Sequence, residues 1–394
     1  MSDIKQLDSD YVLPTYSRNY TEFTHGENAT LFDINNNDYI DFTSGIGVVS
    51  VGHGNKELSS AIAKQASELI HTSNLYVIRS QAETAEAIVK QSGFDMKCFF
   101  ANSGAEANEG AIKIARKYGE VAGEVKRYKI ITLDKSFHGR TISALKATGQ
   151  EAMHNYFGPF PDGFSYANSL DDIEVMIDDH TVAVMIELVQ GEGGIEALDK
   201  QKVKDLAQML KSKDILLMVD EVQTGIYRTG EMLASNYYDI EPDIITLAKG
   251  LGGGVPIGVV MTSHKDILHA GDHGSTFGGN FLSTRAALTV LNILEKEKKS
   301  GELELTVTYF ELALKKLYTK HKHLFDEMVG FGLMRGLRIK EDDVLSKIIT
   351  SAHAHKVLVL KAGRNTLRFL PPLTIKESEI DEGFKRLDNA LSSL

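Results

Sequence analysis

The sequence predicts an α/β protein with a mainly parallel central sheet between helices and a smaller α+β domain built from both termini. Two observations support this fold class. Short apolar runs alternate with longer helical patterns through the middle of the chain, as in successive βαβ units. The 394 residues also exceed one ordinary hydrophobic core. We therefore expect residues 51–285 to form a large domain, and residues 1–50 and 286–394 to form the smaller one.

The two ends of the chain carry separate strand signals. Two strand-like runs, 31–33 and 39–42, flank a turn at 35–38, which predicts a β-hairpin. Toward the C-terminus helical patterns dominate, with two smaller strands expected at 332–339 and 367–370. These segments are the expected material of the smaller domain.

Five apolar runs in the middle of the chain are candidate buried strands, at residues 97–101, 129–133, 182–186, 215–219 and 244–248. A polar or charged residue follows each run: Asn102 with Ser103, Asp134, Glu187, Asp220 and Lys249. Because the ligand crevice of an open α/β sheet lies at the carboxyl ends of its strands, these side chains are expected to converge. The sequence therefore predicts one site built from residues far apart in the chain.

Composition argues against several other classes of protein. A net charge of −11 without a basic patch disfavours a nucleic-acid partner. Cys98 is the only cysteine, so neither an intrachain disulfide framework nor a Cys-rich metal site is expected, and no metal is predicted. The N-terminus lacks a signal-peptide pattern and no run approaches ~18 apolar residues. We expect a cytoplasmic protein without a membrane partner.

The segment 99–108 runs from an apolar strand through a turn of small residues into a helix. A helix N-terminus offers unpaired N–H groups to a phosphate, Ser103 adds a hydroxyl, and Gly104 permits close backbone approach. An ordinary helix N-cap would give the same pattern, so this segment alone leaves both interpretations open.

Asp220 and Lys249 each stand at the end of an apolar strand. A buried carboxylate needs a cationic partner, and the protonated ring nitrogen of pyridoxal phosphate is one. The glycine-rich run 250–258 after Lys249 leaves space for a bulky group, as a Schiff-base lysine with a lowered pKa requires. That run does not fit G-x-G-x-x-G, so a dinucleotide is not expected.

Three further segments of the sequence are informative when they are considered together with Asp220 and Lys249. Phe137 offers an aromatic face to a flat ring, and Arg140 offers a guanidinium to a carboxylate. Glu187 places an acid at another strand end. Arg368 lies between apolar neighbours, where an unpaired charge would be costly.

With these motifs the chain resembles the class III aminotransferases of pyridoxal-phosphate fold type I, and within them the branch of acetylornithine and ornithine aminotransferases. The resemblance extends over nearly the whole chain. Four motifs carry it: Asn-Ser-Gly-Ala-Glu-Ala-Asn-Glu at 102–109, Phe-His-Gly-Arg at 137–140, Asp-Glu-Val-Gln-Thr-Gly at 220–225 and Leu-Ala-Lys-Gly at 247–250. It implies the fold of these PLP-transferases and pyridoxal 5'-phosphate as cofactor.

The resemblance also implies a role for each matching position. The catalytic residues would be Lys249, which binds the cofactor covalently and moves the proton, and Asp220, which partners the ring nitrogen. The cofactor-binding residues would be Ser103, Gly104, Phe137, Asp220, Gln223, Lys249 and Thr276. The substrate-binding residues would be Arg140, Glu187, Ser275 and Arg368. Ser275 and Thr276 would come from the neighbouring subunit, so a homodimer with shared active sites is expected. Glu187 would pair with Arg368 when the substrate has no α-carboxylate there.

The reaction favoured by the resemblance moves the δ-amino group of N2-acetylornithine to 2-oxoglutarate, in arginine biosynthesis. The ornithine-specific relatives carry a tyrosine near Ile46, and an apolar residue there suits an acylated amine better than a free one. Succinyldiaminopimelate, succinylornithine, ornithine and 4-aminobutyrate remain alternative donors. A fold-type-I decarboxylase or racemase would share Lys249 and Asp220 without needing the Glu187–Arg368 switch. A non-catalytic binding protein would most simply have lost Lys249.

Overall fold

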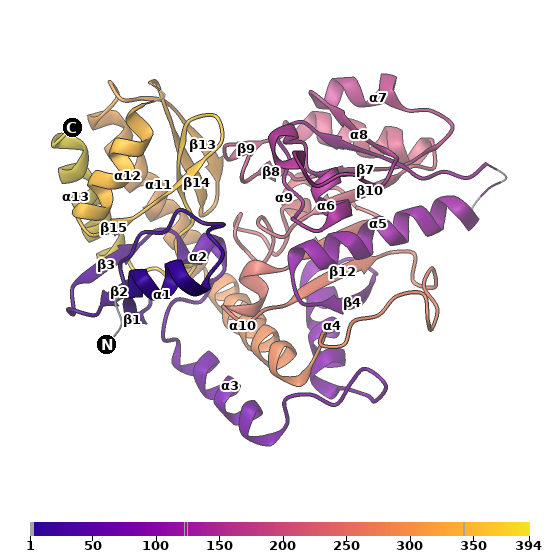
Figure 1. Cartoon of the computed structure of the whole chain (residues 1–394), viewed down its shortest axis with the longest axis horizontal. Coiled ribbons are helices and arrows are strands. Elements are labelled where there is room, and N and C mark those ends of the chain that lie inside the picture. The colour runs from indigo at the N-terminus through magenta and orange to yellow at the C-terminus, as the bar shows by residue number, and fades with distance from the viewer. Residues whose placement is uncertain (1–3, 122, 124, 342) are drawn as a thin grey trace.

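The computed structural model describes residues 4–121, 123, 125–341 and 343–394, and a seven-stranded sheet forms its centre (Figure 1). The strand order is β4-β12-β11-β10-β7-β5-β6. In chain order the strands are β4 (Lys97–Ala101), β5 (Lys129–Leu133), β6 (Phe164–Ala167), β7 (Thr181–Ile186), β10 (Leu216–Asp220), β11 (Ile244–Leu247) and β12 (Gly258–Thr262). All of the predicted buried strands are present, whereas β6 and β12 were not predicted.

Strand direction brings the predicted site residues to one edge of this sheet. β12 runs antiparallel to both of its neighbours, β11 and β4. The remaining neighbouring pairs of the sheet are parallel. The carboxyl ends of β4, β5, β7, β10 and β11 therefore lie on the same side, and the α/β fold class with a mainly parallel sheet is confirmed.

Helices cover both faces of the central sheet because alternate strand residues point to opposite sides. In β7, Ala183 packs in a buried cluster with α5 (Gly104–Val121), and the adjacent Val184 packs in another with α8 (Lys200–Ser212). Both faces are thus buried, which explains why β7 is apolar from Val182 to Ile186.

The remaining strands form smaller sheets. One has the order β1-β2-β3-β15, another β13-β14-β17-β16, and β8 pairs with β9. Their bounds are β1 (Phe23–Glu27), β2 (Thr30–Asp33), β3 (Asp38–Asp41), β8 (Val189–Gln190), β9 (Glu196–Ala197), β13 (Phe325–Phe331), β14 (Met334–Ile339), β15 (Val357–Leu358), β16 (Leu360–Ala362) and β17 (Thr366–Phe369). The predicted hairpin is β2–β3. Because β3 pairs with β15, residues near both ends of the chain share one sheet.

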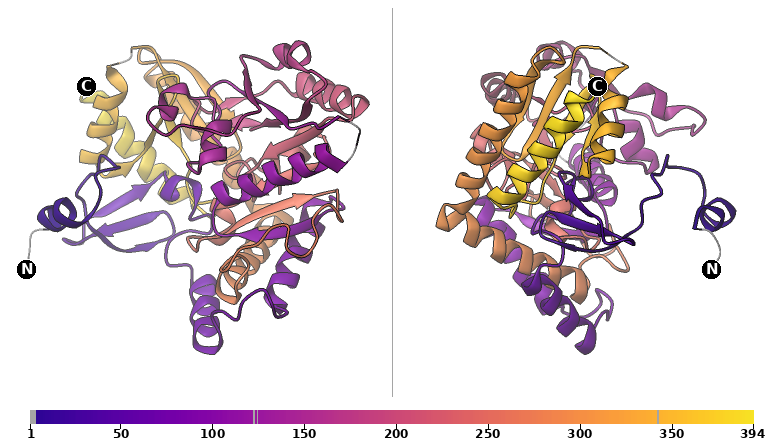
Figure 2. Two further views of the ribbon diagram at one scale, coloured as in Figure 1. Left: turned by 45° about the vertical axis from the view of Figure 1, so that its right-hand side comes forward. Right: turned by 90° about the vertical axis from the view of Figure 1, so that its left-hand side faces the viewer.

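The remaining α-helices are α1 (Ile4–Tyr11), α2 (Ser44–Gly47), α3 (Lys56–Glu68), α4 (Arg79–Ser92), α6 (Ile142–Ala147), α7 (Ile173–Met176), α9 (Ala234–Tyr238), α10 (Phe281–Ser300), α11 (Glu302–Lys320), α12 (Val344–Ala354) and α13 (Glu377–Ser392). The largest apolar cluster contains residues of helices α10 and α13 and of strands β14 and β17. Helix α1 buries none of its residues and stands away from the body in both views of Figure 2. Within the described ranges, no helix is long and apolar enough to cross a bilayer.

Candidate active site

A cavity of about 390 Å³ opens at the carboxyl edge of the seven-stranded sheet. Its walls include these predicted residues: Ser103, Gly104, Phe137, Glu187, Asp220, Gln223 and Lys249. The predicted residues outside its walls are Arg140, Ser275, Thr276 and Arg368, and the strand-end Asp134 is also outside. A larger hollow of about 520 Å³ lies at the opposite ends of β10 and β11 and contains none of the predicted residues. The convergence predicted from the strand ends thus holds for β4, β7, β10 and β11.

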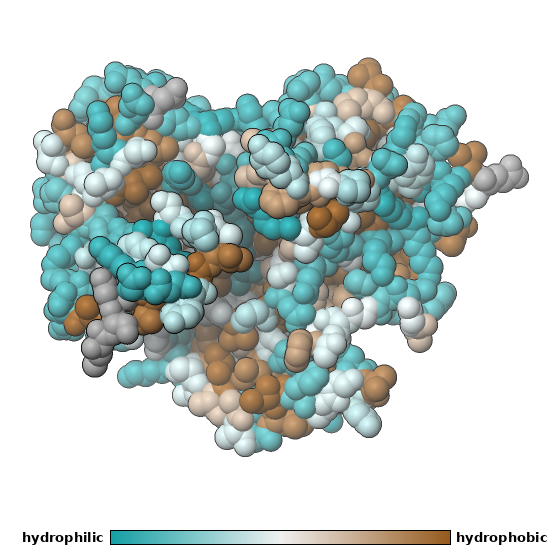
Figure 3. Space-filling view, in the orientation of Figure 1, coloured by the Kyte–Doolittle hydropathy of each residue, from teal (hydrophilic) through white to brown (hydrophobic). Residues whose placement is uncertain are grey.

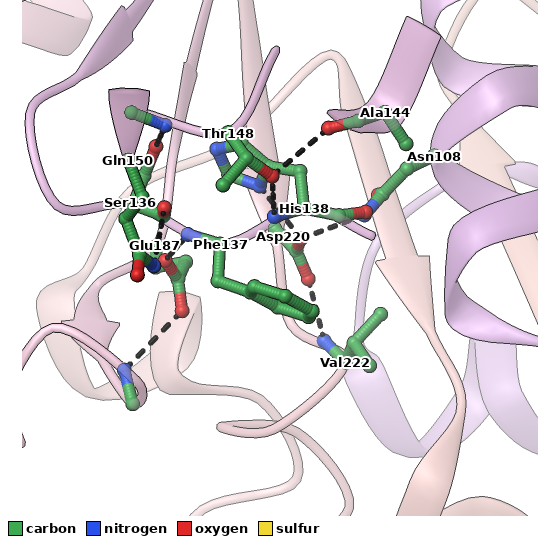
Figure 4. Close-up of polar contacts among 12 residues, drawn as sticks. Asn108, Ser136, Phe137, His138, Ala144, Thr148, Gln150, Glu187, Asp220 and Val222 are labelled. Atoms are coloured by element: carbon green, nitrogen blue, oxygen red, sulfur yellow. Dashed lines mark hydrogen bonds and ion pairs between the residues drawn. The ribbon is translucent and has the colours of Figure 1, made fainter. Parts of the chain in front are cut away.

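Asp220 is held in place by three polar contacts (Figure 4). Asn108 Nδ2 donates to Asp220 Oδ2 over 2.8 Å, and His138 Nδ1 lies 2.8 Å from the same oxygen. The backbone N–H of Val222 donates to Oδ1 over 3.0 Å. Since Asp220 is buried, these contacts compensate for the water that its carboxylate loses. The carboxylate therefore has one orientation.

Lys249 differs from Asp220 because its charged end has no partner. No hydrogen bond or ion pair joins Nζ to any residue in the part of the chain that the structure describes. Burial lowers the pKa of Lys249, against the opposing effect of the nearby acids Glu192, Asp220 and Glu187. Its φ of 39° lies in the left-handed region, which is unusual for a residue other than glycine. An unpaired amine with a lowered pKa is the form that a nucleophilic lysine requires.

The other cavity residues offer groups for binding. Gln223 Oε1 is buried without a hydrogen-bond partner among the described residues. Ser103 Oγ accepts the N–H of Glu106 over 3.2 Å, so this hydroxyl already caps α5. A Cβ on Gly104 would lie 2.7 Å from Val222 Cγ1, so close packing explains why this position is a glycine. The first N–H groups of α5 remain available, as at any helix N-terminus.

These features fit the cofactor that the resemblance implies. The cavity combines an unpaired lysine amine, an oriented carboxylate, an unpaired amide oxygen and a helix N-terminus, with the ring of Phe137 in its wall. Pyridoxal phosphate needs a covalent lysine, a partner for its ring nitrogen, an anion site and a flat surface. Lys249, Asp220, the start of α5 and Phe137 could supply these groups.

Arg368 approaches the cavity from β17 in a different sheet. It is only 3% exposed. Its Nη1 lies 2.6 Å from Glu192 Oε1 and donates to the carbonyl oxygen of Gly191 over 3.4 Å. Arg368 Nε is buried without a partner in the described chain. Because Glu192 lines the cavity, this ion pair connects the arginine to the site of Lys249.

In this structure Arg368 pairs with Glu192 and not with Glu187, which the resemblance implied as its partner when the substrate has no α-carboxylate. Glu187 Oε1 accepts the N–H of Phe137 over 2.8 Å, and Oε2 accepts the N–H of Gly191 over 3.2 Å (Figure 4). Both oxygens are therefore occupied by backbone donors. The chain turns through the short strand β8 after Glu187, and this path carries Glu192 to Arg368 instead.

Burial governs the protonation of Glu187. It raises the pKa of this carboxyl to about 7, while His138 lowers it and Asp220 raises it further. The N–H groups of Phe137 and Gly191 act in the opposite direction from burial. Glu187 therefore changes charge near neutral pH.

The remaining predicted residues lie around the rim. Arg140 is exposed, with its guanidinium carbon 5.7 Å from the centre of the Phe137 ring. Ser275 Oγ accepts from Asn102 Nδ2 over 3.1 Å, and Thr276 is exposed. The structure thus brings Arg140 beside the cavity and ties the Ser275 loop to the turn after β4.

Ile46 also lies outside the cavity walls. It is 43% exposed and has a φ of 67°, in the left-handed region. Val48, two residues later, is part of the wall. The segment considered for donor preference therefore reaches the cavity through Val48.

Sequence reasoning missed Asn108, His138 and Glu192 as members of the site. Asn108 and His138 lie inside the motifs that carry the resemblance, and Glu192 lies a few residues after the predicted strand 182–186. The contacts of all three are with residues distant in sequence. A second acid five positions after Glu187 was the available signal for Glu192.

Comparisons with known proteins agree with this geometry. The family described as aminotransferase class-III matches residues 14–391. An acetylornithine aminotransferase from Wolinella succinogenes is 61% identical over 98% of this chain and 99% of its own. The crystal structure of N-acetylornithine aminotransferase from Stenotrophomonas maltophilia has a TM-score of 0.82 at 31% identity and 98% coverage of both chains. A Toxoplasma gondii ornithine aminotransferase, described with partial occupancy of PLP at its active site, has a TM-score of 0.92 at 30% identity, covering 99% of this chain and 94% of its own.

Proposed function

Because the chain belongs to the class-III aminotransferase family, we propose that it transfers the δ-amino group of N2-acetylornithine to 2-oxoglutarate. The products would be N-acetylglutamate 5-semialdehyde and glutamate. Enzymes of this family use pyridoxal phosphate, so the chain is a pyridoxal-phosphate-dependent aminotransferase. The names of the W. succinogenes and S. maltophilia proteins support acetylornithine as the donor.

The observation that carries this proposal is the buried Arg368 with a protein acid, Glu192, as its ion-pair partner. Glutamate has two carboxylates, whereas acetylornithine has one, and that one lies far from its reacting δ-amine. A buried arginine cannot be left unpaired without a large cost in free energy. Glu192 would neutralise Arg368 when acetylornithine is bound and would move aside for the α-carboxylate of glutamate. A single-substrate decarboxylase or racemase would not need this exchange.

The residues at the floor of the cavity would perform the proton transfer. The cofactor supplies an electron sink for the carbon that gains or loses the amine. Asp220 would keep a proton at the ring nitrogen, because its carboxylate is oriented by Asn108 and His138. Lys249 would hold the cofactor covalently and then carry the proton on Nζ, for which a lowered pKa is suited.

Binding groups surround these two residues. The start of α5 with Ser103 and Gly104 would take the phosphate, Phe137 would cover the ring, and Gln223 would contact the phenolic oxygen. Arg140 at the rim would hold the substrate carboxylate that is remote from the reacting carbon. Its exposed position beside Phe137 supports this role, because a substrate must reach it from solvent.

A homodimer with shared active sites is part of the proposal. The segment 69–77 exposes large apolar side chains, among them Leu75 at 89% and Val77 at 92%. Asn74 Nδ2 in this segment donates to the carbonyl oxygens of Ser275 and Gly278 over 3.0 and 2.9 Å. Monomers rarely expose such segments. A second copy covering this segment would also meet the loop of Ser275 and Thr276, which would complete its active site.

The surface supports a docking face in this region. Figure 3 shows apolar surface gathered on the lower part of the molecule, where α3 and α10 lie. Isolated subunits are expected to be inactive, since Thr276 does not reach the cavity of its own chain. We keep the cytoplasm as the expected compartment and arginine biosynthesis as the expected pathway.

A donor panel tests the choice of substrate. The purified enzyme would be assayed with 2-oxoglutarate and each of acetylornithine, succinylornithine, succinyldiaminopimelate, ornithine and 4-aminobutyrate. The proposal requires the highest kcat/KM for acetylornithine. A higher value for any other donor would reassign the substrate within the same family. Failure of glutamate to bleach the cofactor absorbance would contradict transamination itself.

A further inference from the structure

Glu187 connects two segments of the active site that are far apart in the chain. It follows β7 and is 5% exposed. One carboxylate oxygen accepts the N–H of Phe137, in the segment after β5, and the other accepts the N–H of Gly191, after β8. Figure 4 shows the Glu187 side chain beside the backbone of Phe137. A single carboxylate therefore joins the segments on either side of it.

Each of these segments carries a different part of the site. Phe137 lies in the cavity wall. Gly191 precedes Glu192, the ion-pair partner of Arg368, and its own carbonyl oxygen accepts from Arg368. A displacement of Glu187 would therefore affect the positions of both Phe137 and Glu192, the acid that neutralises Arg368.

The two contacts require a side chain with two acceptor oxygens. A carboxylate accepts at both, whereas an amide offers one oxygen and one NH2 group, which cannot accept from a backbone N–H. Burying an acid costs free energy, and burial is the main cause of the raised pKa of Glu187. An acid at this position is thus explained by its two backbone donors.

Space around the second contact is also limited. A Cβ on Gly191 would lie 2.3 Å from Gln223 Oε1. The backbone of Gly191 is therefore confined between Gln223 and the carboxylate of Glu187. Gly191 is thus in contact on both sides, and the carbonyl oxygen of the following Glu192 also accepts the N–H of Gly363 over 2.8 Å.

We propose that Glu187 is a positioning residue that couples the aromatic wall at Phe137 to the Glu192–Arg368 ion pair. This proposal rests on the proposed function of that ion pair in distinguishing two substrates. Glu187 acts through Phe137 and Gly191 and needs no contact with a substrate. Its loss therefore disturbs cofactor retention and substrate preference together.

The test compares Glu187→Gln with Glu192→Gln in the holoenzyme above pH 7, where Glu187 is ionised and both of its oxygens accept. Two quantities are measured: the rate at which the cofactor dissociates, and the ratio of single-turnover rates for glutamate and acetylornithine. Leaving a buried N–H unpaired, or losing a hydrogen bond to a charged group, changes a rate or an equilibrium constant by about tenfold. Glu187→Gln is expected to speed cofactor dissociation and to raise the glutamate ratio, each by about three- to tenfold. Glu192→Gln is expected to raise the ratio while leaving dissociation within about twofold.

Two further variants complete the design. Glu187→Asp keeps the charge but shortens the side chain, so it should lose the hydrogen bond to Phe137 or to Gly191. It should therefore change the rate of cofactor dissociation, the ratio of single-turnover rates, or both. Glu174→Gln, an exposed acid on α7, should change neither. If Glu187→Gln moves only one quantity, or neither, the coupling is wrong. If Glu192→Gln speeds dissociation equally, Glu187 has no separate role.

Failure of the proposed substrate can be distinguished from failure of this coupling. If acetylornithine is not a donor for the wild-type enzyme, the proposed function fails. The same comparison can then use the best donor of the panel against glutamate, because cofactor dissociation does not depend on the donor. Unequal behaviour of the Glu187 and Glu192 variants would still support the coupling.

Discussion

The floor of the cavity and its rim are built in different ways. On the floor, Asp220 at the end of β10 accepts from Asn108 of α5 and from the backbone N–H of Val222, and it contacts His138. The rim here includes the ion pair of Arg368 and Glu192. Arg368 comes from β17, and the side chain of Glu192 is 32% exposed. The floor is therefore preorganised, whereas the proposed function requires the ion pair of the rim to exchange partners.

This difference matches the two demands on a transaminase. The same cofactor chemistry serves both half-reactions, so its supporting groups can be fixed. The two substrates differ in their carboxylates, so the groups that recognise them must change partners. If floor and rim have these separate roles, substitutions in the two regions should affect turnover and substrate preference differently.

The largest effect is expected on the floor. Lys249→Ala removes the covalent attachment and the proton carrier together, so turnover should fall by at least roughly 10²–10⁴-fold. Cofactor absorbance after gel filtration would show whether binding through Asp220 persists. Lys211→Ala, an exposed lysine on α8, should keep turnover. Wild-type turnover in Lys249→Ala would exclude this mechanism.

At the rim, a smaller and substrate-selective effect is expected. Arg368→Ala should slow the glutamate half-reaction by roughly 10- to 100-fold more than the acetylornithine half-reaction, because a charged contact to the α-carboxylate is lost. Glu192→Ala should shift the preference toward glutamate. Single-turnover bleaching with each donor measures both changes. Equal losses for the two donors in Arg368→Ala would leave the pair with a structural role only.

The rim should also depend on a second subunit. Val77→Lys places a charge in the exposed apolar segment and should weaken association by about tenfold or more. Sedimentation and activity measured across dilution would follow dissociation. Val175→Lys, at a valine on α7 that is 84% exposed, serves as the control. Full activity of a dissociated Val77→Lys subunit would show that the active site is complete in one chain.

The smallest effect concerns the pH dependence of stability at Glu187, between floor and rim. Its pKa is raised to about 7, so the folded protein keeps a proton that the unfolded chain has lost above its ordinary value of 4.5. Stability from this group is therefore present at low pH and falls as pH rises toward 7. Between pH 5.5 and 6.5 the wild type should lose about 1 kcal/mol relative to Glu187→Gln. Urea unfolding at both pH values tests this, and parallel curves would contradict it.

Local patterns were enough to predict five of the seven strands of the central sheet, and Asp220 and Lys249 of the floor. Apolar runs with a polar residue after them place Asp220 and Lys249 at strand ends, and parallel strands put such ends at one edge. The same reasoning placed Asp134 in the site, but the structure puts it outside the walls. A strand end fixes the edge of the sheet but not the direction of the following turn. The division at residues 50 and 285 stays a prediction.

The sequence by itself determined the α/β fold, the motifs that identify the family, and the chemistry available at the cavity floor, because periodicity and strand-end position are local properties. Only the tertiary structure decided that Glu192 meets Arg368 and that Glu187 binds backbone N–H groups. It also placed Asn108 and His138 on Asp220. These contacts join segments distant in the chain, and the path of each loop decides which of two nearby acids faces the arginine.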